Sequence, residues 1–316
     1  MLDLLVKNIG ELATAQGTTP KKGKAQGEVQ ISHQVCIGIT NGKISYVGPE
    51  EEAPATKEVF DAEGCLVTPG LVDAHTHLVF GGWRQHELPQ KLAGATYLEI
   101  LKGGGGILST VRSTRAATEE ELVEKTRKLL DQMIAHGTTT VEAKSGYGLS
   151  TAEELKQLRV VRTLQGAHPI DLVSTFMGAH AVPEEYKSDR AGYVKLVCEE
   201  MIPTVAKENL AEFCDIFCET AVFDVEETRQ ILNCAKKYGF GIKLHGDEID
   251  PIGGGELAGE LDALSAEHLI EASDAGIEAM AKSGTIGVLL PATSLYLDKS
   301  FARARKLLDT HMAVAV

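Results

Sequence analysis

This chain of 316 residues lacks the features that would direct it to a membrane, to nucleic acid or to an oxidising compartment. It has no run of about 18 apolar residues, the length of a transmembrane helix. The segment MLDLLVKNIGEL has neither the basic start nor the long apolar core of a signal peptide. The six cysteines include no Cys-x-x-Cys pair, which indicates reduced thiols. We therefore expect a cytoplasmic protein that does not associate with membranes.

The chain also lacks clustered positive charge. Its net charge is −14, and no group of Lys or Arg interrupts this acidic balance, so nucleic acid is not an expected partner. An anionic small-molecule substrate would need a local cation in its pocket. The apolar content of 43% and the 32 glycines are typical of a globular protein with many turns.

Residues 1–65 and residues 66–316 differ in their sequence pattern. Short β-like runs dominate residues 1–65, and QVCIGITNGKISYVG predicts a hairpin because alternating runs flank Asn41-Gly42, a strong turn signal. We expect a small, β-sandwich-like domain there. After residue 65, short apolar runs alternate with amphipathic helical stretches, a pattern typical of β/α units around a parallel sheet.

Eight strands are expected in residues 66–316, the last of them interrupted at Val316. They lie within the segments GLVDAHTHLVF, TTTVEAKSGYG, DLVSTFMGAHA, CDIFCETAVF, GFGIKLHGDE, LSAEHLIEA, GTIGVLLPAT and MAVAV. Eight strands with intervening helices predict an α/β fold of the (β/α)8 TIM-barrel class. Active sites in this fold lie at the carboxyl ends of the strands.

The first of these strands carries two histidines, His75 and His77. Residues two apart on a strand face the same side, so both imidazoles point together and can bind one transition-metal ion. The alternative is a pair of structural histidines at a strand end. Further ligands downstream favour the metal site.

More polar residues follow at other strand ends, where they would converge on one mouth of the barrel. Tyr147 follows the second strand, His180 ends the third, His245 ends the fifth and His268 lies on the sixth. With His245, the chain supplies three nitrogen ligands, and an open fourth position is typical of a catalytic metal site. Glu248 lies three residues after His245, where a carboxylate could move protons beside the ion. Its alternative is a solvated loop acid.

These motifs resemble the amidohydrolase superfamily, in the mononuclear branch that includes cytosine and guanine deaminases. The resemblance rests on three features: the motif PGLVDAHTH, the strand-five His with a Glu three residues later, and the strand-six His. Within that superfamily, the sequence is similar to the imidazolonepropionases across essentially the whole chain. The specific motifs are FGGWRQHE, KGGGGILSTVRSTR, EAKSGYGLS, FMGAHAVPEEY and KLHGDEI.

The resemblance implies a hydrolase that converts 4-imidazolone-5-propanoate to N-formimidoyl-L-glutamate, the third step of histidine degradation. It implies one zinc or iron ion, a homodimer, and metal binding by His75, His77 and His245. Glu248 matches the acid/base that also contacts the imidazolone ring, and His268 matches a histidine that supports the metal centre or stabilises the oxyanion. Arg84, Tyr147 and His180 match the substrate-binding residues. Arg84 suits a propionate, because a guanidinium binds a carboxylate bidentately.

Two other functions stay open at this point. The His-x-His, His-x-x-Glu and second-His pattern is shared with aminohydrolases, or deaminases, that act on heterocyclic bases. The imidazolonepropionases also carry an Asp metal ligand at the end of strand eight, in a Thr-Asp-x-Asn-Pro-Gly segment. This sequence stops before it, at Val316. We therefore expect a truncated chain, and a non-catalytic remnant is the second alternative.

Overall fold

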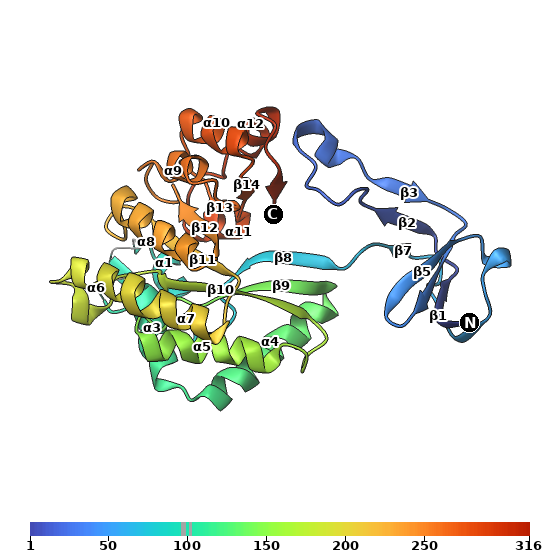
Figure 1. Cartoon of the computed structure of the whole chain (residues 1–316), viewed down its shortest axis with the longest axis horizontal. Helices are drawn as coiled ribbons and strands as arrows, with labels where there is room; N and C mark the ends of the chain where they lie inside the picture. Colours follow the sequence, from blue (N-terminus) through green and yellow to red (C-terminus); the bar gives the residue numbers. More distant parts are fainter. Residues whose placement is uncertain (96–98, 101–102) are drawn as a thin grey trace. The chain divides into compact units, whose positions relative to one another are not determined.

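The structure is a computed structural model that describes residues 1–95, 99–100 and 103–316, so that Lys102 of the glycine-rich motif lies outside it. The chain divides into two units, Met1–Gly70 and Leu71–Val316 (Figure 1). The division comes later than the expected boundary at residue 65, because β7 (Leu66–Val67) pairs with β2 (Glu11–Thr14) of the first unit. Among the described residues, no helix has both the length and the apolar character needed to cross a bilayer.

The first unit contains two small sheets, as expected for its β-rich sequence. Four strands form one sheet in the order β5 (Lys43–Gly48), β4 (Cys36–Thr40), β1 (Leu2–Lys7) and β6 (Thr56–Asp61). The other has the order β3 (Gln30–Ser32), β2 and β7, and short 3-10 turns η1 (Gly23–Gly27) and η2 (Glu50–Glu52) complete the unit. The predicted hairpin is confirmed: β4 and β5 are antiparallel, and Asn41 and Gly42 both have the positive φ of a type I′ turn.

The second unit is a parallel, nearly closed eight-stranded barrel, which confirms the predicted fold class. Neighbouring strands pair in chain order. They are β8 (Leu71–Thr76), β9 (Thr138–Lys144), β10 (Asp171–Ala179), β11 (Phe213–Cys218), β12 (Gly241–Gly246), β13 (Ser265–His268), β14 (Ile286–Val288) and β15 (Val314–Ala315). Seven of them lie within a predicted segment, and β11 begins one residue before the segment CDIFCETAVF. Because all neighbours are parallel, every carboxyl end reaches the same mouth.

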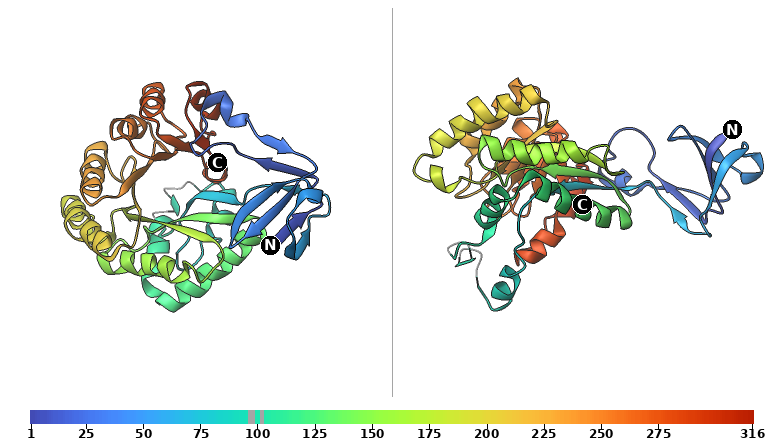
Figure 2. Two further views of the ribbon diagram at one scale, coloured as in Figure 1. Left: turned by 45° about the vertical axis from the view of Figure 1, so that its right-hand side comes forward. Right: turned by 90° about the horizontal axis from the view of Figure 1, so that it is seen from below.

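The helices of this unit are α1 (Glu87–Leu92), α3 (Gly106–Ala116), α4 (Glu119–Ala135), α5 (Thr151–Leu164), α6 (Arg190–Leu196), η4 (Val197–Met201), α7 (Ile202–Glu208), α8 (Val225–Lys237), α9 (Gly254–Glu260), α10 (Asp274–Ser283), α11 (Pro291–Tyr296) and α12 (Ala304–Asp309); a 3-10 turn, η3 (Glu184–Tyr186), precedes α6. Most of these helices cover the outer side of the barrel strands (Figure 2), whereas residues of α1 and α11 line the cavity described below.

The longest helix, α4, shows how local sequence places a helix on the barrel. Thr118 and Glu121 form a capping box at its N-terminus, which satisfies backbone N–H groups that have no partner within the helix. Its apolar stripe follows the helical period, so Leu122 and Leu130 are buried against Val141 of β9 and its neighbours. Burial of each such leucine stabilises the fold by about 1.5–3 kcal/mol.

Candidate active site

One cavity of about 440 Å³ lies at the carboxyl ends of the barrel strands. All eight residues singled out from the sequence line it: His75, His77, Arg84, Tyr147, His180, His245, Glu248 and His268. They come from five different β/α segments spread over almost 200 residues of sequence. The cavity is of a size that ordinary small-molecule sites have.

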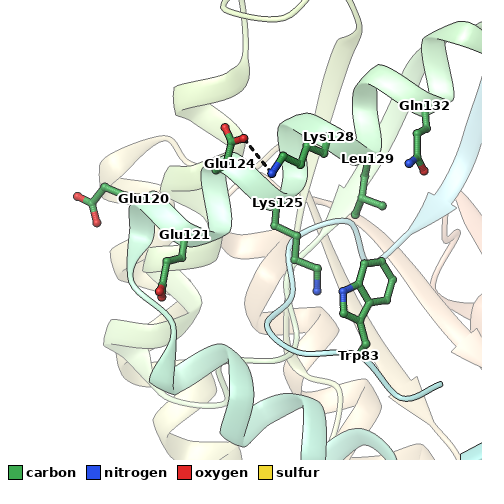
Figure 3. Close-up of a pocket in the computed structure, with 8 residues that line it drawn as sticks. All are labelled: Trp83, Glu120, Glu121, Glu124, Lys125, Lys128, Leu129 and Gln132. Carbon is green, nitrogen blue, oxygen red and sulfur yellow. Dashed lines mark ion pairs between the residues drawn. The ribbon is translucent and has the colours of Figure 1, made fainter. Parts of the chain in front are cut away.

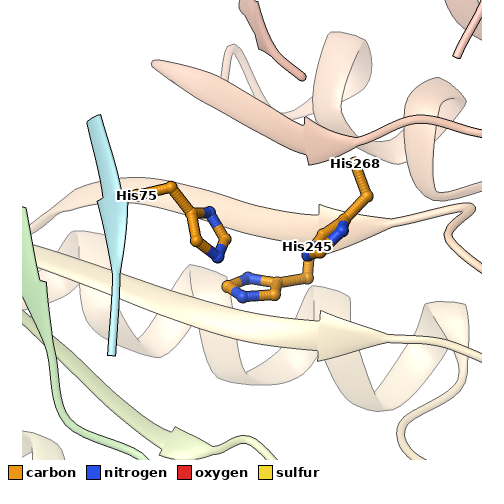
Figure 4. Close-up of side chains that lie close together, drawn as sticks. All are labelled: His75, His245 and His268. Atoms are coloured by element: carbon orange, nitrogen blue, oxygen red, sulfur yellow. The ribbon is translucent and has the colours of Figure 1, made fainter. Parts of the chain in front are cut away.

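Four imidazoles, here called the histidine centre, converge in this cavity: His75, His77, His245 and His268. Figure 4 shows His75, His245 and His268 pointing toward one another from three strands, and their nitrogen donors lie within 4.8 Å of one another. His77 is not in that set of three, but its Nε2 lies 3.3 Å from Nε2 of His245. His268 is thus close enough to the predicted ligands to belong to the same centre.

The facing nitrogens of His77 and His245 fit a metal ion. Nδ1 of His77 donates to the Ser145 carbonyl at 3.2 Å, and Nδ1 of His245 donates to Asp215 at 3.0 Å. Each neutral ring then has a lone pair on Nε2, and two lone pairs cannot hydrogen-bond to each other. Two nitrogens on one tetrahedral zinc ion, each about 2.0–2.1 Å from it, lie about 3.3–3.4 Å apart. The separation of 3.3 Å between the two Nε2 atoms matches this geometry.

Burial favours the neutral form of His75, His77 and His268, and the neutral form of histidine is the one that binds metals. Burial lowers the pKa of His75 to about 4, and it lowers the pKa of His77 and His268 well below the usual range. Neighbouring imidazoles lower the pKa of His77 and His268 further, since a second positive charge nearby is unfavourable. No proton must be displaced from the ring before an ion can bind at neutral pH.

A buried cluster of charged residues lies directly behind the histidine centre. Lys144, at the end of β9, is fully buried, and its ammonium is 2.7 Å from Asp215, 2.8 Å from Glu142 and 3.1 Å from Glu267. Lys243 reaches the same cluster, at 2.6 Å from Glu142 and 3.0 Å from Glu267. Lys144 contacts three acids of this cluster, whereas Lys243 contacts two. Lys144 is the centre of an ion-pair network inside the barrel.

Mutual attraction keeps Lys144, Asp215 and Glu267 ionised in spite of burial. Burial alone would lower the pKa of Lys144, but Asp215, Glu267 and Glu142 raise it well above the usual range. Burial would likewise raise the pKa of Glu267, but Lys144 and His75 hold it well below its ordinary value. An isolated charge could not be kept in this interior, whereas paired charges with hydrogen bonds can.

Glu248 stands at the edge of the histidine centre. Its carboxylate lies 3.4 Å from Nδ1 of His268, and burial raises the pKa of Glu248 to about 7. The loop that carries it is held from below by Glu219, a buried carboxylate that accepts the backbone N–H groups of Glu248, Ile249 and Asp250 at 3.1, 2.8 and 3.2 Å. The alternative of a solvated loop acid is therefore wrong.

Tyr147 and His180 form a second wall of the cavity. The His180 ring stacks on His77, with centroids 4.4 Å apart and planes 8° apart, and its Nδ1 donates to the Gly146 carbonyl at 3.0 Å. Gly146 has φ of +111°, and a Cβ there would lie 2.9 Å from Nδ1 of His180, so this turn requires glycine. Glu154 and Gln157 of α5 accept the N–H groups of Gly146, Tyr147 and their neighbours, which fixes the loop.

Two cations, Arg84 and Lys91, line the cavity among the described residues, and are called the cation pair below. Arg84 follows a loop that is anchored from outside the barrel: the Lys125 ammonium lies 3.5 Å from the Phe80 ring centroid and 4.1 Å from that of Trp83, and donates to the Gly82 carbonyl (Figure 3). Lys91 lies 3.4 Å from the Tyr296 ring centroid and donates to the Tyr296 carbonyl at 3.2 Å.

Four residues that contribute to the site were not predicted from the sequence: Asp215, Glu267, Glu219 and Lys91. A weak signal existed for the first two, since CDIFC and LSAEHL each place an acid within an apolar strand, where a charge is costly unless paired. Nothing local distinguishes Lys91 from a solvated helix lysine, because its partner Tyr296 is about 200 residues away.

Comparison with known proteins links the chain to amidohydrolases. An amidohydrolase family model matches residues 58–107. An imidazolonepropionase from Thermoanaerobacter pseudethanolicus is 50% identical over 314 residues, covering 99% of this chain and 76% of that protein. An imidazolonepropionase from Bacillus cytotoxicus is 52% identical over 320 residues, covering 100% of this chain and 75% of that protein.

Solved structures with the same fold are more distant in sequence. An adenosine deaminase from Xanthomonas campestris with bound zinc superposes with a TM-score of 0.65 at 18% identity, covering 99% of this chain and 68% of that one. A 5-methylcytosine deaminase from Klebsiella pneumoniae superposes with a TM-score of 0.69 at 16% identity, covering 98% and 73%. At these identities the likeness is one of fold.

Proposed function

The chain belongs to the imidazolonepropionase family, and we propose that it hydrolyses 4-imidazolone-5-propanoate to N-formimidoyl-L-glutamate, the third step of histidine degradation. The observation that carries this proposal is the single cavity in which the histidine centre, Glu248 and the cation pair meet. The substrate is a cyclic amide with a carboxylate tail. The histidine centre and Glu248 would act on the ring, and the cation pair would bind the tail.

We assign one zinc or iron ion to the histidine centre, with His75, His77 and His245 as its protein ligands. The separation of 3.3 Å between the Nε2 atoms of His77 and His245 supports this assignment. When bound, such an ion acts as a Lewis acid, which lowers the pKa of water and polarises a carbonyl group.

Glu248 is the proton-transfer group in this proposal. In the reaction, the oxygen of water adds to the ring carbonyl carbon, the bond from that carbon to the ring nitrogen breaks, and the nitrogen takes a proton. Glu248 accepts the proton of water and returns it to the departing nitrogen; a group whose pKa lies near the working pH is best suited to both transfers. His268, 3.4 Å from Glu248, is placed to stabilise the oxygen that gains negative charge.

The substrate is held by Arg84, Tyr147 and His180. Arg84 supplies a planar fork for the propionate carboxylate. His180, which donates through Nδ1 to Gly146, keeps Nε2 as an acceptor for an N–H group of the ring. Lys91 adds a second positive charge to the same cavity.

The test is to incubate the 316-residue chain with 4-imidazolone-5-propanoate, to identify products by mass spectrometry and to measure bound metals by elemental analysis. We expect N-formimidoyl-L-glutamate without ammonia. Ammonia from a purine or pyrimidine would instead identify an aminohydrolase. A folded, metal-loaded chain without turnover of either substrate class would leave the non-catalytic alternative.

A homodimer and a cytoplasmic location are further proposals, which rest on the resemblance and on sequence composition. Sedimentation velocity of the purified chain tests the first, and fractionation of cells that express it tests the second. A monomer at micromolar concentration would contradict the dimer.

A further inference from the structure

The buried charge cluster contains a set of donors that could hold a second cation. Asp215, His245 and Glu267 place one ligand atom each within 4.8 Å of one another, and all three are buried. The two carboxylates are the groups available to a cation there, because Nε2 of His245 faces His77 and its Nδ1–H is donated to Asp215. The position beside the two carboxylates is filled by the chain itself: Nζ of Lys144 lies 2.7 Å from Asp215 and 3.1 Å from Glu267.

The same two carboxylates also contact the histidine centre. Asp215 receives the Nδ1–H of His245 on Oδ1 while its Oδ2 faces Lys144. Glu267 contacts both Nδ1 of His75 and Nζ of Lys144. Carboxylates behind metal-ligating histidines set the tautomer and orientation of the ring. Here both carboxylates share one ammonium.

The other members of the cluster, Glu142 and Lys243, do not connect the acid behind His245 with the acid behind His75. Glu142 contacts Lys144 at 2.8 Å and Lys243 at 2.6 Å, and it accepts a hydrogen bond from the Thr175 hydroxyl at 2.6 Å. Lys243 contacts Glu142 and Glu267. Within the described residues, Lys144 is therefore the cation shared by the acids behind His245 and His75.

We propose that Lys144 is a positioning residue that occupies the place of a second metal ion and holds Asp215 and Glu267 against His245 and His75. The inference rests on the proposed function, because it concerns the metal centre named there. It explains why a barrel mouth with this many ligands takes a single ion: the second cation is covalently part of the protein.

The first experiment replaces one carboxylate at a time. In Asp215→Asn the side chain keeps its shape but loses the charge behind His245, and we expect the affinity for Zn²⁺, measured by competition with a chelator, to fall roughly 10- to 100-fold. Glu142→Gln is the matched control, because it removes one charge from the same cluster but contacts neither histidine; its affinity should stay within about threefold of the unmodified chain. Equal affinities in the two variants would overturn the proposal.

The second experiment replaces one lysine at a time and counts bound metal. Lys144→Met should take up a second equivalent of Zn²⁺ on dialysis, whereas Lys243→Met and the unmodified chain should take up one. A single equivalent in a folded Lys144→Met chain, as judged by circular dichroism, would overturn the proposal. Should Lys144→Met fail to fold, the comparison of Asp215→Asn with Glu142→Gln decides, since both variants keep Lys144.

Failure of this inference can be told apart from failure of the proposed function. If the unmodified chain hydrolyses imidazolone propanoate but Asp215→Asn binds Zn²⁺ as tightly as Glu142→Gln does, only the role of Lys144 and its acids is wrong. If the metal measurements follow expectation but the substrate is not hydrolysed, only the reaction is wrong. A chain that binds no divalent ion would contradict both.

Discussion

The histidine centre and the cation pair share one cavity but are supported in different ways. Behind His245 and His75 stand carboxylates that are completely buried and are themselves held by Lys144. Arg84 and Lys91 are only half-buried, and they lie on residues 84–92, a short stretch that connects to the barrel through Lys125 and Tyr296. The centre is thus organised before any ligand arrives, whereas the cations remain in contact with water until a substrate covers them.

This difference predicts what each region contributes. A change in the histidine centre should affect metal occupancy and turnover, because the ligand geometry cannot be rebuilt from elsewhere. A change in the cation pair should affect substrate affinity, because the rest of the cavity stays intact. The following four variants test that separation, from the largest expected effect to the smallest.

Removal of a ligand should have the largest effect. His245→Ala deletes the ring whose Nε2 lies 3.3 Å from that of His77, and the remaining imidazoles should not hold the ion against water. Elemental analysis should find little metal, and turnover should fall below that of every other variant here. His33→Ala, at an exposed histidine of the first unit, is the control. Full metal occupancy in His245→Ala would remove His245 from the ligand set.

Removal of the proton-transfer group should come next. Glu248→Gln preserves shape but cannot titrate, so kcat should fall by roughly 10²–10⁴ while the metal stays bound. Asp250→Asn, two residues further along the same loop, should keep near-normal turnover. If Glu248→Gln lost metal together with activity, Glu248 would belong to the metal-binding part of the centre.

Arg84→Ala should weaken substrate binding without loss of metal. Removal of one partner of a largely desolvated charge pair costs about 2–5 kcal/mol, which is roughly 30- to several-thousand-fold in affinity. The lower part of that range applies here, because Arg84 is half-exposed before substrate binds. Arg84→Lys should lose less, because the charge remains although the bidentate fork does not.

A ligand without the carboxylate serves as the control for Arg84→Ala. An imidazolone without the propionate should bind the unmodified chain and Arg84→Ala about equally, because it never used the arginine. Arg162→Ala, at an exposed arginine of α5, should change nothing. Equal losses for both ligands would mean that Arg84 supports the loop rather than the carboxylate.

Lys91→Met should have the smallest effect. The ammonium of Lys91 is already engaged by the ring and the carbonyl of Tyr296, so little of its charge is free for a substrate. An ion pair between a solvent-exposed cation and a carboxylate contributes about 0.2–1 kcal/mol, so KM should rise by no more than about fivefold. A loss as large as that of Arg84→Ala would make Lys91 an equal partner in carboxylate binding.

The barrel and the convergence of the histidines could be predicted because both follow from local patterns. Alternating apolar runs and helices indicated eight β/α units, and parallel strands bring all their carboxyl ends to one mouth. The residues that hold Glu248 and the histidines in position were not predicted. Glu219 and Glu248 are 29 positions apart, and no sequence period connects an acid on one strand with the backbone of the next loop.

The ion-pair partners of Lys144 could not be predicted from the sequence either. Its sequence neighbours, EAKSG, are compatible with a solvated loop lysine, a structural residue or a metal-site lysine. Only the closing of the sheet brings Asp215 and Glu267, which lie 71 and 123 residues further along the chain, to within 3.1 Å of its ammonium.

The sequence by itself therefore determined the order of the strands, the mouth at which the site lies and the types of residue that face it, because these depend on periodicity and on chain direction. The tertiary structure decided which charges pair inside the barrel. Coulombic pairing depends on distances in space between residues far apart in sequence. The ion pairs behind His245 and His75 exist only once the barrel has formed, because Lys144, Asp215 and Glu267 lie on the alternate strands β9, β11 and β13 and meet in its interior.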